Sequence, residues 1–425
     1  MDIKELHKRF ASCPCGREHN CDIAEVKIGH GVINEIGELC AEYEKILLVS
    51  DENTYKYAKG VESILSEKTE KSIVLKAQKD VVIPNEEKIA ELENALSSET
   101  DLIIGVGSGV INDLCKHVSF KRGLPYYIAA TAPSMDGYAS VGAALILGGM
   151  KVTLNARPPK AIIADTEILK CAPIDMLRAG YGDIVGKFSC LNDWRLGALV
   201  NGEYFCQRVY DLTFECAERV KDLAEGIQNR DEKSIELLTE ALITVGVAMS
   251  YVKNSRPASG SEHHLSHFFE ITGILDGKPY FAHGIDVLFS AVCVQRLREE
   301  IIKAEKPKSF KLPDNAEYER AIKRIYKSAS DGVIELQKKT GFYTDGNIGT
   351  YTDNWDRIKA LLNETPSCSE MLGYVRKIGL DINDFEALYG KEKIRDATFF
   401  AKDLKDRYTV LWLYFYLNYN SSEEK

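Results

Sequence analysis

The sequence predicts an α/β protein in two parts: an N-terminal α/β domain with a parallel Rossmann-like sheet and an all-helical C-terminal domain. Three observations predict this class. Short apolar runs alternate with amphipathic helical patterns over residues 1–170, a glycine-rich turn joins one such run to a helix, and helical periodicity dominates residues 171–425. Strands that alternate with helices imply a parallel sheet with right-handed crossovers. We therefore place the domain boundary between residues 170 and 171.

The period of the apolar residues gives the elements of the first part. Buried runs predict strands, and amphipathic runs predict the helices between them. The expected strands are 45–50, 72–76, 101–106, 126–130, 152–154 and 161–164. The expected helices are 54–66, 85–96 and 111–122, after a helix-like segment at the N-terminus.

Helices account for the second part. The amphipathic patterns predict helices over 203–224, 231–252, 318–339 and 353–362. Pro313 and Gly341 mark breaks, and the polar tail 421–425 is expected to be disordered. A cleft between two such domains is a common place for a ligand.

Composition excludes several classes of protein. The chain has 425 residues and a net charge of -10, so it lacks the basic stripe of a nucleic-acid-binding protein. The segment Met1–Phe10 has no apolar core of the kind a signal peptide needs, and no run of 18 apolar residues predicts a transmembrane helix. The 11 scattered cysteines fit reduced cytosolic thiols better than a disulfide framework. We expect a cytoplasmic protein without membrane insertion.

One group of cysteines stands apart near the N-terminus. Cys13, Cys15, His19 and Cys21 lie close together in the sequence, and their residue types could suit a metal. However, structural zinc sites usually show Cys pairs separated by two to four residues, and Cys-x-Cys is tighter than that. The sequence therefore leaves the role of this cluster open.

A glycine-rich turn is the first chemical signal. It reads Gly105-Val106-Gly107-Ser108-Gly109, between an expected strand and an expected helix. Glycines let the backbone approach a pyrophosphate, and the helix start presents N–H groups to its charge. The strict dinucleotide pattern has its third glycine at position 110, where this chain has Val110. A plain glycine turn therefore stays as the alternative.

Polar residues follow two other expected strands. Asp51 ends the first, where an acid can bind ribose hydroxyls and repel a 2′-phosphate, which would favour NAD over NADP; a helix N-cap is the alternative. The segment Thr131–Ser140, which includes Ser134 and Asp136, follows the strand 126–130. Because open α/β sheets bind ligands at the carboxyl ends of their strands, we favour a binding role over an ordinary turn.

Histidines give the second chemical signal. Four of the eight are His263, His264, His267 and His283, and the first and third of these share one face of a helix. Upstream, Asp183 follows two glycines in a GYGD run at an expected helix start. An Asp with two or three His suits zinc, nickel or ferrous iron and leaves a coordination position open for substrate. Surface or helix-capping histidines are the alternative.

A zinc-protease helix is excluded by the same residues. That motif needs Glu directly after the first His. Here His264 follows His263, and Glu262 precedes it. A hydrolase would therefore lack its general base.

At these residues the chain resembles the bacterial-type sn-glycerol-1-phosphate dehydrogenases, in the superfamily of iron-containing alcohol dehydrogenases and dehydroquinate synthase. The resemblance runs from the N-terminal CPCGREH to about residue 290 and rests on GVGSGVIND, TAPSMDGYAS, GYGD, SGSEHHLSH and AHG, in this order. It implies a dehydroquinate synthase-like fold, NAD or NADP as cofactor, one divalent metal per chain and a homodimer. The implied reaction interconverts dihydroxyacetone phosphate and sn-glycerol 1-phosphate.

The resemblance also implies the roles of single residues. Gly105 to Gly109 would hold the cofactor pyrophosphate, while the remaining side chains along the cofactor would be Thr131, Ser134 and Ser140. The metal would be bound by Asp183, His263 and His283. The substrate would be contacted by Asp136, Asp183 and His267.

Three basic residues near these motifs are less clearly assigned. His264 matches no ligand position and is expected to be structural. Lys187 and Arg256 are candidates for contacts with the substrate phosphate, and either could instead be a surface charge.

The implied chemistry is a reversible hydride transfer. The metal would polarise the C2 oxygen of the ketone, the nicotinamide would deliver the hydride, and His267 or a water would exchange the proton. Asp183 and His267 are thus the expected catalytic residues. Zinc, nickel and iron all accept this ligand set, so the metal stays open.

Three alternatives remain from the sequence. A polyol dehydrogenase of the same fold would act on free glycerol, and a dehydroquinate synthase-like lyase would use NAD only transiently. A non-catalytic metal-binding protein would keep the fold alone. The TAPSMDGYAS segment argues, by resemblance, against the lyase.

Overall fold

The computed structural model describes residues 1–77, 81–148, 150–310, 314–341 and 348–418, which form two compact units. The first unit comprises Met1–Ile184 and Asp211–Ser255, and the second comprises Val185–Tyr210 and Arg256–Lys425. The sequence suggested one boundary at 170/171, whereas both units are discontinuous. Helix α11 (Glu232–Val252) explains this, because it packs on the sheet strand β1 and on the 3-10 helix η2 (Asp136–Ala139) of the first unit.

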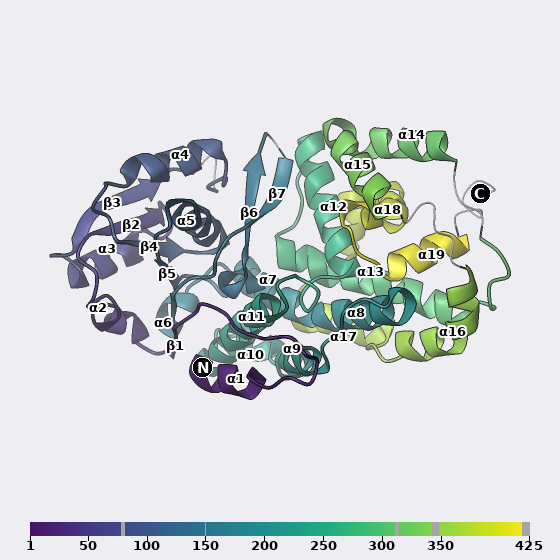
Figure 1. Ribbon diagram of the computed structural model, residues 1–425, viewed down its shortest axis with the longest axis horizontal. Coiled ribbons are helices and arrows are strands. Elements are labelled where there is room, and N and C mark those ends of the chain that lie inside the picture. Colours follow the sequence, from purple (N-terminus) through teal and green to yellow (C-terminus); the bar gives the residue numbers. More distant parts are fainter. Residues whose placement is uncertain (78–80, 149, 311–313, 342–347, 419–425) are drawn as a thin grey trace. The chain divides into compact units, whose positions relative to one another are not determined.

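Six parallel strands form the main sheet of the first unit, in the order β1-β8-β5-β4-β2-β3 (Figure 1). They are β1 (Glu25–Gly29), β2 (Ile46–Asp51), β3 (Thr69–Leu75), β4 (Leu102–Gly107), β5 (Tyr126–Ala130) and β8 (Ala161–Asp165). The prediction of a parallel sheet is confirmed. Strand β1 was not predicted, because it is an edge strand with a single buried residue, Val26, and therefore has no apolar run.

The expected strand 152–154 lies in a different sheet. It is part of β7 (Met150–Asn155), which pairs antiparallel with β6 (Gly142–Leu147) in a separate two-stranded sheet. The turn between them is too short for a crossover, so the pair can only be a hairpin.

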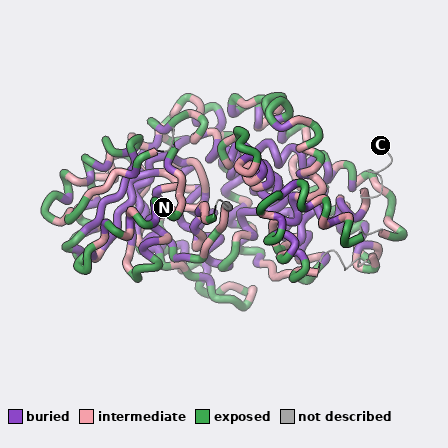
Figure 2. The backbone as a smooth tube through the Cα atoms, turned by 90° about the horizontal axis from the view of Figure 1, so that it is seen from above, coloured by how far each residue is buried: buried purple, intermediate pink, exposed green. Residues whose placement is uncertain are grey.

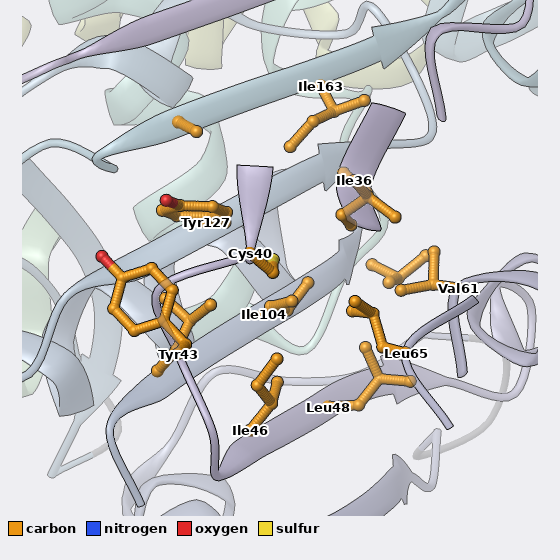
Figure 3. Packing of buried hydrophobic residues seen from close by; sticks show 14 of the residues in the cluster. Ile36, Cys40, Tyr43, Ile46, Leu48, Val61, Leu65, Ile104, Tyr127 and Ile163 are labelled. Atoms are coloured by element: carbon orange, nitrogen blue, oxygen red, sulfur yellow. The ribbon is translucent and has the colours of Figure 1, made fainter. Parts of the chain in front are cut away.

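Helices cover both faces of the six-stranded sheet. Helices α2 (Ile36–Leu39) and α3 (Tyr55–Ile64) lie on one side, and α4 (Glu86–Ala95) and α5 (Gly109–Arg122) on the other. Figure 3 shows the first of these interfaces, where Ile36, Val61 and Leu65 pack against strand residues that include Leu48 and Ile104. Strands β2, β4, β5 and β8 are buried along their whole length, as expected for a doubly covered sheet, and appear as purple segments in Figure 2.

The other helices of the first unit are α1 (Ile3–Phe10), α6 (Thr166–Leu169), α7 (Ile174–Val185), α9 (Gln207–Val220), α10 (Ala224–Gln228) and α11. The unit boundaries fall in the last turn of α7 and in the first turn of α9. The expected helix 203–224 is found as α9, which is shorter at both ends. Helix α11 is long and apolar enough to span a membrane, with a mean hydropathy of 1.5 over its best window, yet 83% of that window is buried inside the protein. It is best described as a core helix.

Helices and short 3-10 turns make up the regular structure of the described part of the second unit. The helices are α8 (Lys187–Asn201), α12 (Ser261–Asp276), α13 (His283–Lys303), α14 (Asn315–Tyr326), α15 (Ser330–Thr340), α16 (Ile348–Leu362), α17 (Cys368–Lys377), α18 (Ile382–Phe400) and α19 (Val410–Asn418). The all-helical prediction is confirmed, but the expected helix 318–339 is split at Lys327, whose φ is 46°. Gly341 ends α15 as predicted, whereas Pro313 and the tail 421–425 lie outside the described residues.

Candidate active site

The predicted cofactor residues lie at one edge of the six-stranded sheet. The register pairs Ser50 of β2 with Val106 of β4, and Gly107 of β4 with Ala130 of β5, so three strands end side by side. From β2 the chain moves outward to β3 and then returns to β4 on the other side of β2. The reversal makes the carboxyl ends of β2 and β4 the topological switch point, which is where open α/β sheets bind ligands.

The glycine loop joins β4 directly to α5. A Cβ on Gly107 would lie 2.6 Å from Ile111 Cβ, so only glycine lets α5 approach the strand this closely. Ser108 is the N-cap residue, but its side chain makes no capping bond to the first turn of α5. The first-turn N–H groups at this helix start are therefore suited to receive an anion.

Asp51 forms the turn between β2 and α3. Its Oδ1 accepts the N–H groups of Asn53 and Thr54, each at 2.9 Å, but the N-cap residue of α3 is Thr54, so Asp51 supports the helix start without being the predicted N-cap. Thr54 Oγ1 in turn donates to Val106 O at 2.8 Å, which ties this turn to the glycine loop.

Two helix glycines shape the loop 131–140. The loop starts where the Thr131 N–H donates to Gly107 O at 3.1 Å. A Cβ on Gly180 of α7 would fall onto Pro133 O, and a Cβ on Gly246 of α11 would lie 2.6 Å from Asp136 O. Gly180 lies in the interior of α7, and Asp183 lies near its end. The prediction that GYGD begins a helix is therefore wrong.

Lys116 holds the far end of this loop. Its buried Nζ donates to Gly137 O at 2.7 Å and to Gly142 O at 3.0 Å, and it contacts Ser140 Oγ at 3.3 Å. Burial lowers the pKa of Lys116, although the nearby Asp113 carboxylate opposes this. Sequence reasoning missed this lysine, since no periodicity marks a charge on the buried face of a helix. Ser140 therefore takes part in the loop's own hydrogen bonds, with Lys116 and with Gly137 O.

Asp136 and Asp183 are joined within the first unit. The Asp136 N–H donates to Asp183 Oδ2 at 3.0 Å, and Asp183 is fully buried. The loop end that carries the predicted substrate residue is thus fixed to the carboxylate predicted to bind the metal. Ser134 lies on the same loop and is partly exposed.

Three of the four clustered histidines come together in the second unit. The rings of His263 and His283 are 5.2 Å apart, those of His267 and His283 are 5.4 Å apart, and those of His263 and His267 are 6.1 Å apart. His263 and His267 lie on one face of α12 as predicted, and His283 is the first residue of α13.

Neighbouring side chains orient the two predicted histidine ligands. His263 Nδ1 lies 2.6 Å from Glu262 Oε1, and His283 Nδ1 lies 3.3 Å from Ser266 Oγ. Burial alone would raise the pKa of Glu262, but the bonds from His263 and the Gly260 N–H outweigh it and hold that pKa below its ordinary value. A ligating histidine typically donates its second ring N–H to such a group, which leaves Nε2 for the metal. The pair therefore fits a nitrogen-binding divalent metal.

A buried ion pair supports the start of α12. Asp193 of α8 accepts the Ser261 N–H at 2.7 Å and pairs with Arg298 of α13 at 3.2 Å. Arg298 also donates to Ser189. Neither these residues nor Glu262 and Ser266 were predicted, but Glu262 could have been found from its position directly before the first histidine.

The three other basic residues, His264, Arg256 and Lys187, are buried inside the second unit. His264 is fully buried, burial holds its pKa well below the ordinary value, and neither ring nitrogen has a hydrogen-bond partner among the described residues. Arg256 is buried against Glu203 and donates to Tyr408 O at 2.7 Å, while Lys187 donates to Ala258 O at 3.0 Å. The surface-charge alternative for Lys187 and Arg256 is therefore wrong, and these contacts favour structural roles over phosphate binding.

Comparison with known proteins gives the family. Residues 27–173 match the iron-containing alcohol dehydrogenase family. Over 418 residues the chain is 31% identical to a protein of Bacillus licheniformis named glycerol-1-phosphate dehydrogenase (NAD(P)+), which covers 96% of this chain and 93% of the relative. A protein of the same name from Methanosarcina barkeri is 39% identical over 250 residues, or 57% of this chain and 68% of the relative.

Solved structures agree on the fold. An archaeal halo-thermophilic Red Sea brine pool alcohol dehydrogenase superposes with a TM-score of 0.61 at 15% identity, covering 94% of this chain and 98% of that one. An iron-containing alcohol dehydrogenase from Thermococcus thioreducens gives a TM-score of 0.55 at 14% identity, covering 85% and 99%. The Bacillus licheniformis relative matches over nearly its full length and therefore shows the family as well as the fold. The chain belongs to the glycerol-1-phosphate dehydrogenases of the iron-containing alcohol dehydrogenase family.

Proposed function

We propose that this chain is an NAD(P)-dependent sn-glycerol-1-phosphate dehydrogenase, which transfers hydride reversibly between dihydroxyacetone phosphate and sn-glycerol 1-phosphate. The observation that carries the proposal is the match over nearly the full length of the Bacillus licheniformis relative. The residues needed for this chemistry are present in the chain, at the sheet edge of the first unit and on α12 and α13 of the second.

The cofactor would lie along the carboxyl edge of the sheet. The N–H groups around Ser108 and Gly109 would bind the pyrophosphate at the start of α5. Asp51 Oδ2 would accept a ribose hydroxyl, and its charge would favour NAD over NADP. Thr131, Ser134 and Ser140 would line the cofactor from the loop that Lys116 and Gly246 hold in place.

The metal ligands would be Asp183, His263 and His283. Support for the histidines comes from the acceptors at their Nδ1 atoms, which leave both Nε2 atoms for a cation. Support for Asp183 comes from its complete burial and from its bond with the Asp136 N–H, which holds its carboxylate at the loop that carries the predicted substrate residue. A bound divalent metal supplies a Lewis acid that polarises the C2 oxygen, and a bound nicotinamide supplies the hydride.

The protein's own groups would then orient the substrate and move the proton. Asp136 and Asp183 would bind the hydroxyls of the substrate, and the bond from the Asp136 N–H to Asp183 Oδ2 holds the Asp136 backbone beside the Asp183 carboxylate. His267, one helical turn from His263, would exchange the proton with the C2 oxygen. We further propose a cytoplasmic homodimer with zinc or nickel as metal, iron being the third option.

The test follows NADH absorbance with the purified chain, first stripped of metal by a chelator and then supplied with zinc, nickel or ferrous iron. We expect rapid oxidation with dihydroxyacetone phosphate, slow or no oxidation with dihydroxyacetone, and sn-glycerol 1-phosphate as the only enantiomer formed. His263→Ala should lose metal binding and turnover together, while an Arg178→Ala variant, altered at a partly exposed residue of the first unit that pairs with Asp175, should retain both.

Three results would overturn parts of this proposal. Faster oxidation with the free ketone would assign the chain to the polyol dehydrogenases. Phosphate release without net change in NADH would assign it to the lyases. Full activity of the chelated enzyme, or of His263→Ala, would refute the metal assignment.

A further inference from the structure

We propose that Cys13, Cys15 and His19 bind a second metal ion, a structural Zn²⁺ that fastens the N-terminal segment to helix α11. This N-terminal site lies within the first unit and shares no residue with the ligands proposed for catalysis. The proposal does not depend on the enzyme's reaction.

The three donor atoms are already gathered. The two sulfurs and the His19 Nε2 lie within 4.8 Å of one another, and Cys15 Sγ is 3.1 Å from that nitrogen. Neighbouring ligand atoms of a tetrahedral zinc are about 3.5–3.8 Å apart at ordinary Zn–S and Zn–N bond lengths. Small side-chain adjustments therefore suffice to bring all three onto one ion.

A tight turn compensates for the short Cys-x-Cys spacing. The Gly16 N–H donates to Cys13 O at 3.3 Å, and Gly16 takes a φ of 77°, which glycine adopts without strain. The turn brings both sulfurs to the same side as His19. The spacing that made a zinc site doubtful in the sequence is thus resolved by the backbone.

The orientation of His19 is that of a metal ligand. Its Nδ1 lies 3.1 Å from Tyr251 O, and a carbonyl can only accept, so Nδ1 carries the proton and Nε2 presents a lone pair to the sulfurs. A backbone carbonyl in this role is the usual support of a zinc-bound histidine. The ring is buried and packs edge-on against Phe10 at 5.7 Å, so it cannot turn away easily.

Cys21, the fourth member of the cluster in the sequence, is set apart. Its Sγ lies 3.2 Å from His7 Nε2, and burial raises its pKa to about 11, so it stays a thiol. The three-residue set supplies two thiolates and one imidazole, and a fourth ligand completes the tetrahedron. Soft thiolate donors favour zinc over the harder divalent ions.

The ion would anchor the segment that follows α1. Helix α1 is held by its buried Ile3, Leu6 and Phe10, whereas residues 11–24 contain no helix or strand. His19 joins this segment to Tyr251 at the end of α11, the helix that also contacts the loop carrying Asp136.

The experiment measures metal content and thiolate ligation on the full-length enzyme. Elemental analysis should give two metal equivalents per chain, and Cys13→Ser with Cys15→Ser should remove one of them. Cys171→Ser, which alters an exposed thiol outside the site, is the matched control and should keep both. In the Co²⁺-substituted enzyme, a near-ultraviolet sulfur-to-cobalt band should survive His263→Ala and vanish in the double Cys variant.

A measurement on the unaltered chain keeps the proposal testable if the double variant fails to fold. Strong chelation should expose two additional thiols to a thiol reagent, and added zinc should protect them again. A cobalt enzyme without a sulfur charge-transfer band would overturn the proposal, as would equal zinc content in the unaltered and doubly substituted chains.

Discussion

Gly246→Ala is the sharpest test of how the fold positions the site. In α11 the new Cβ would lie 2.6 Å from Asp136 O and 2.8 Å from Ala139 Cβ. Ordinary contacts are about 3.3 Å for carbon–oxygen and about 3.8 Å for carbon–carbon pairs. The 3-10 helix η2 must therefore retreat by roughly 0.7–1 Å. It cannot do so freely, because Ser250 Oγ, one turn along α11, donates to Ala139 O at 2.8 Å.

A displacement of about 1 Å in a positioned group can cost roughly 100-fold in rate, so kcat/KM for dihydroxyacetone phosphate should fall by about that factor. Overpacking should also lower the free energy of unfolding by about 1–3 kcal/mol, partly offset by about 1 kcal/mol of helix propensity. The assays are NADH oxidation and urea unfolding. Gly60→Ala, in α3 with nothing within 4 Å, should keep full activity and gain slightly in stability. Unchanged kcat/KM in Gly246→Ala would refute the reasoning.

Three further substitutions test other parts of the chain. Glu262→Gln removes the charged acceptor of His263 Nδ1–H, so the dissociation constant of the catalytic metal should rise about 10–100-fold in a metal titration; Glu203→Gln, which weakens a pair with Arg256 instead, should leave that constant unchanged. Asp51→Asn keeps Oδ1 as an acceptor but removes a charge, so the ratio of kcat/KM for NADP to that for NAD should rise about fivefold, as expected for about 1 kcal/mol of lost repulsion; an unchanged ratio would exclude the ribose contact. Burial lowers the pKa of Lys402 from 10.5 to about 8 despite its pair with Asp403, so above pH 8 the folded chain releases this proton while the unfolded chain keeps it. The free energy of unfolding of the unaltered chain, relative to Lys402→Arg, should therefore rise by roughly 3 kcal/mol as pH rises from the folded to the unfolded pKa of Lys402, and this gain should be lost over the same range as pH falls; a pH-independent difference would contradict this.

The central strands were the elements that the sequence predicted most accurately. The strand 126–130 was predicted with the bounds that the structure gives it, and β2 and β4 differ from their predictions by one residue at each end. Such strands are covered by helices on both faces, so their apolar runs are continuous and unmistakable. The edge strand β1 and the hairpin strand β6 were not predicted, because each buries only part of its residues and so shows no continuous apolar run.

The site was predictable only where residue type alone carries the chemistry. The four clustered histidines and the glycine loop can be recognised in one dimension, and the structure brings His263, His267 and His283 together. What orients them cannot be recognised this way. The acceptor for His283 comes from another helix, Ser266 of α12, and the support of α12 comes from Asp193 of α8. Residues that meet across two helices have no fixed separation in the sequence, so no motif reveals such contacts.

The helix glycines show how far packing overrides local preference. Gly180 and Gly246 each occupy the interior of a helix, where glycine costs about 1 kcal/mol relative to alanine. Both positions face the same loop, one at Pro133 and the other at Asp136 and Ala139. Two helices thus lose stability to let the loop 131–140 pack closely against them. This indicates that the position of the loop matters more than the stability of either helix. Lys116 fixes the other end of the loop at Gly137 and Gly142, so the fold itself holds this segment from both sides.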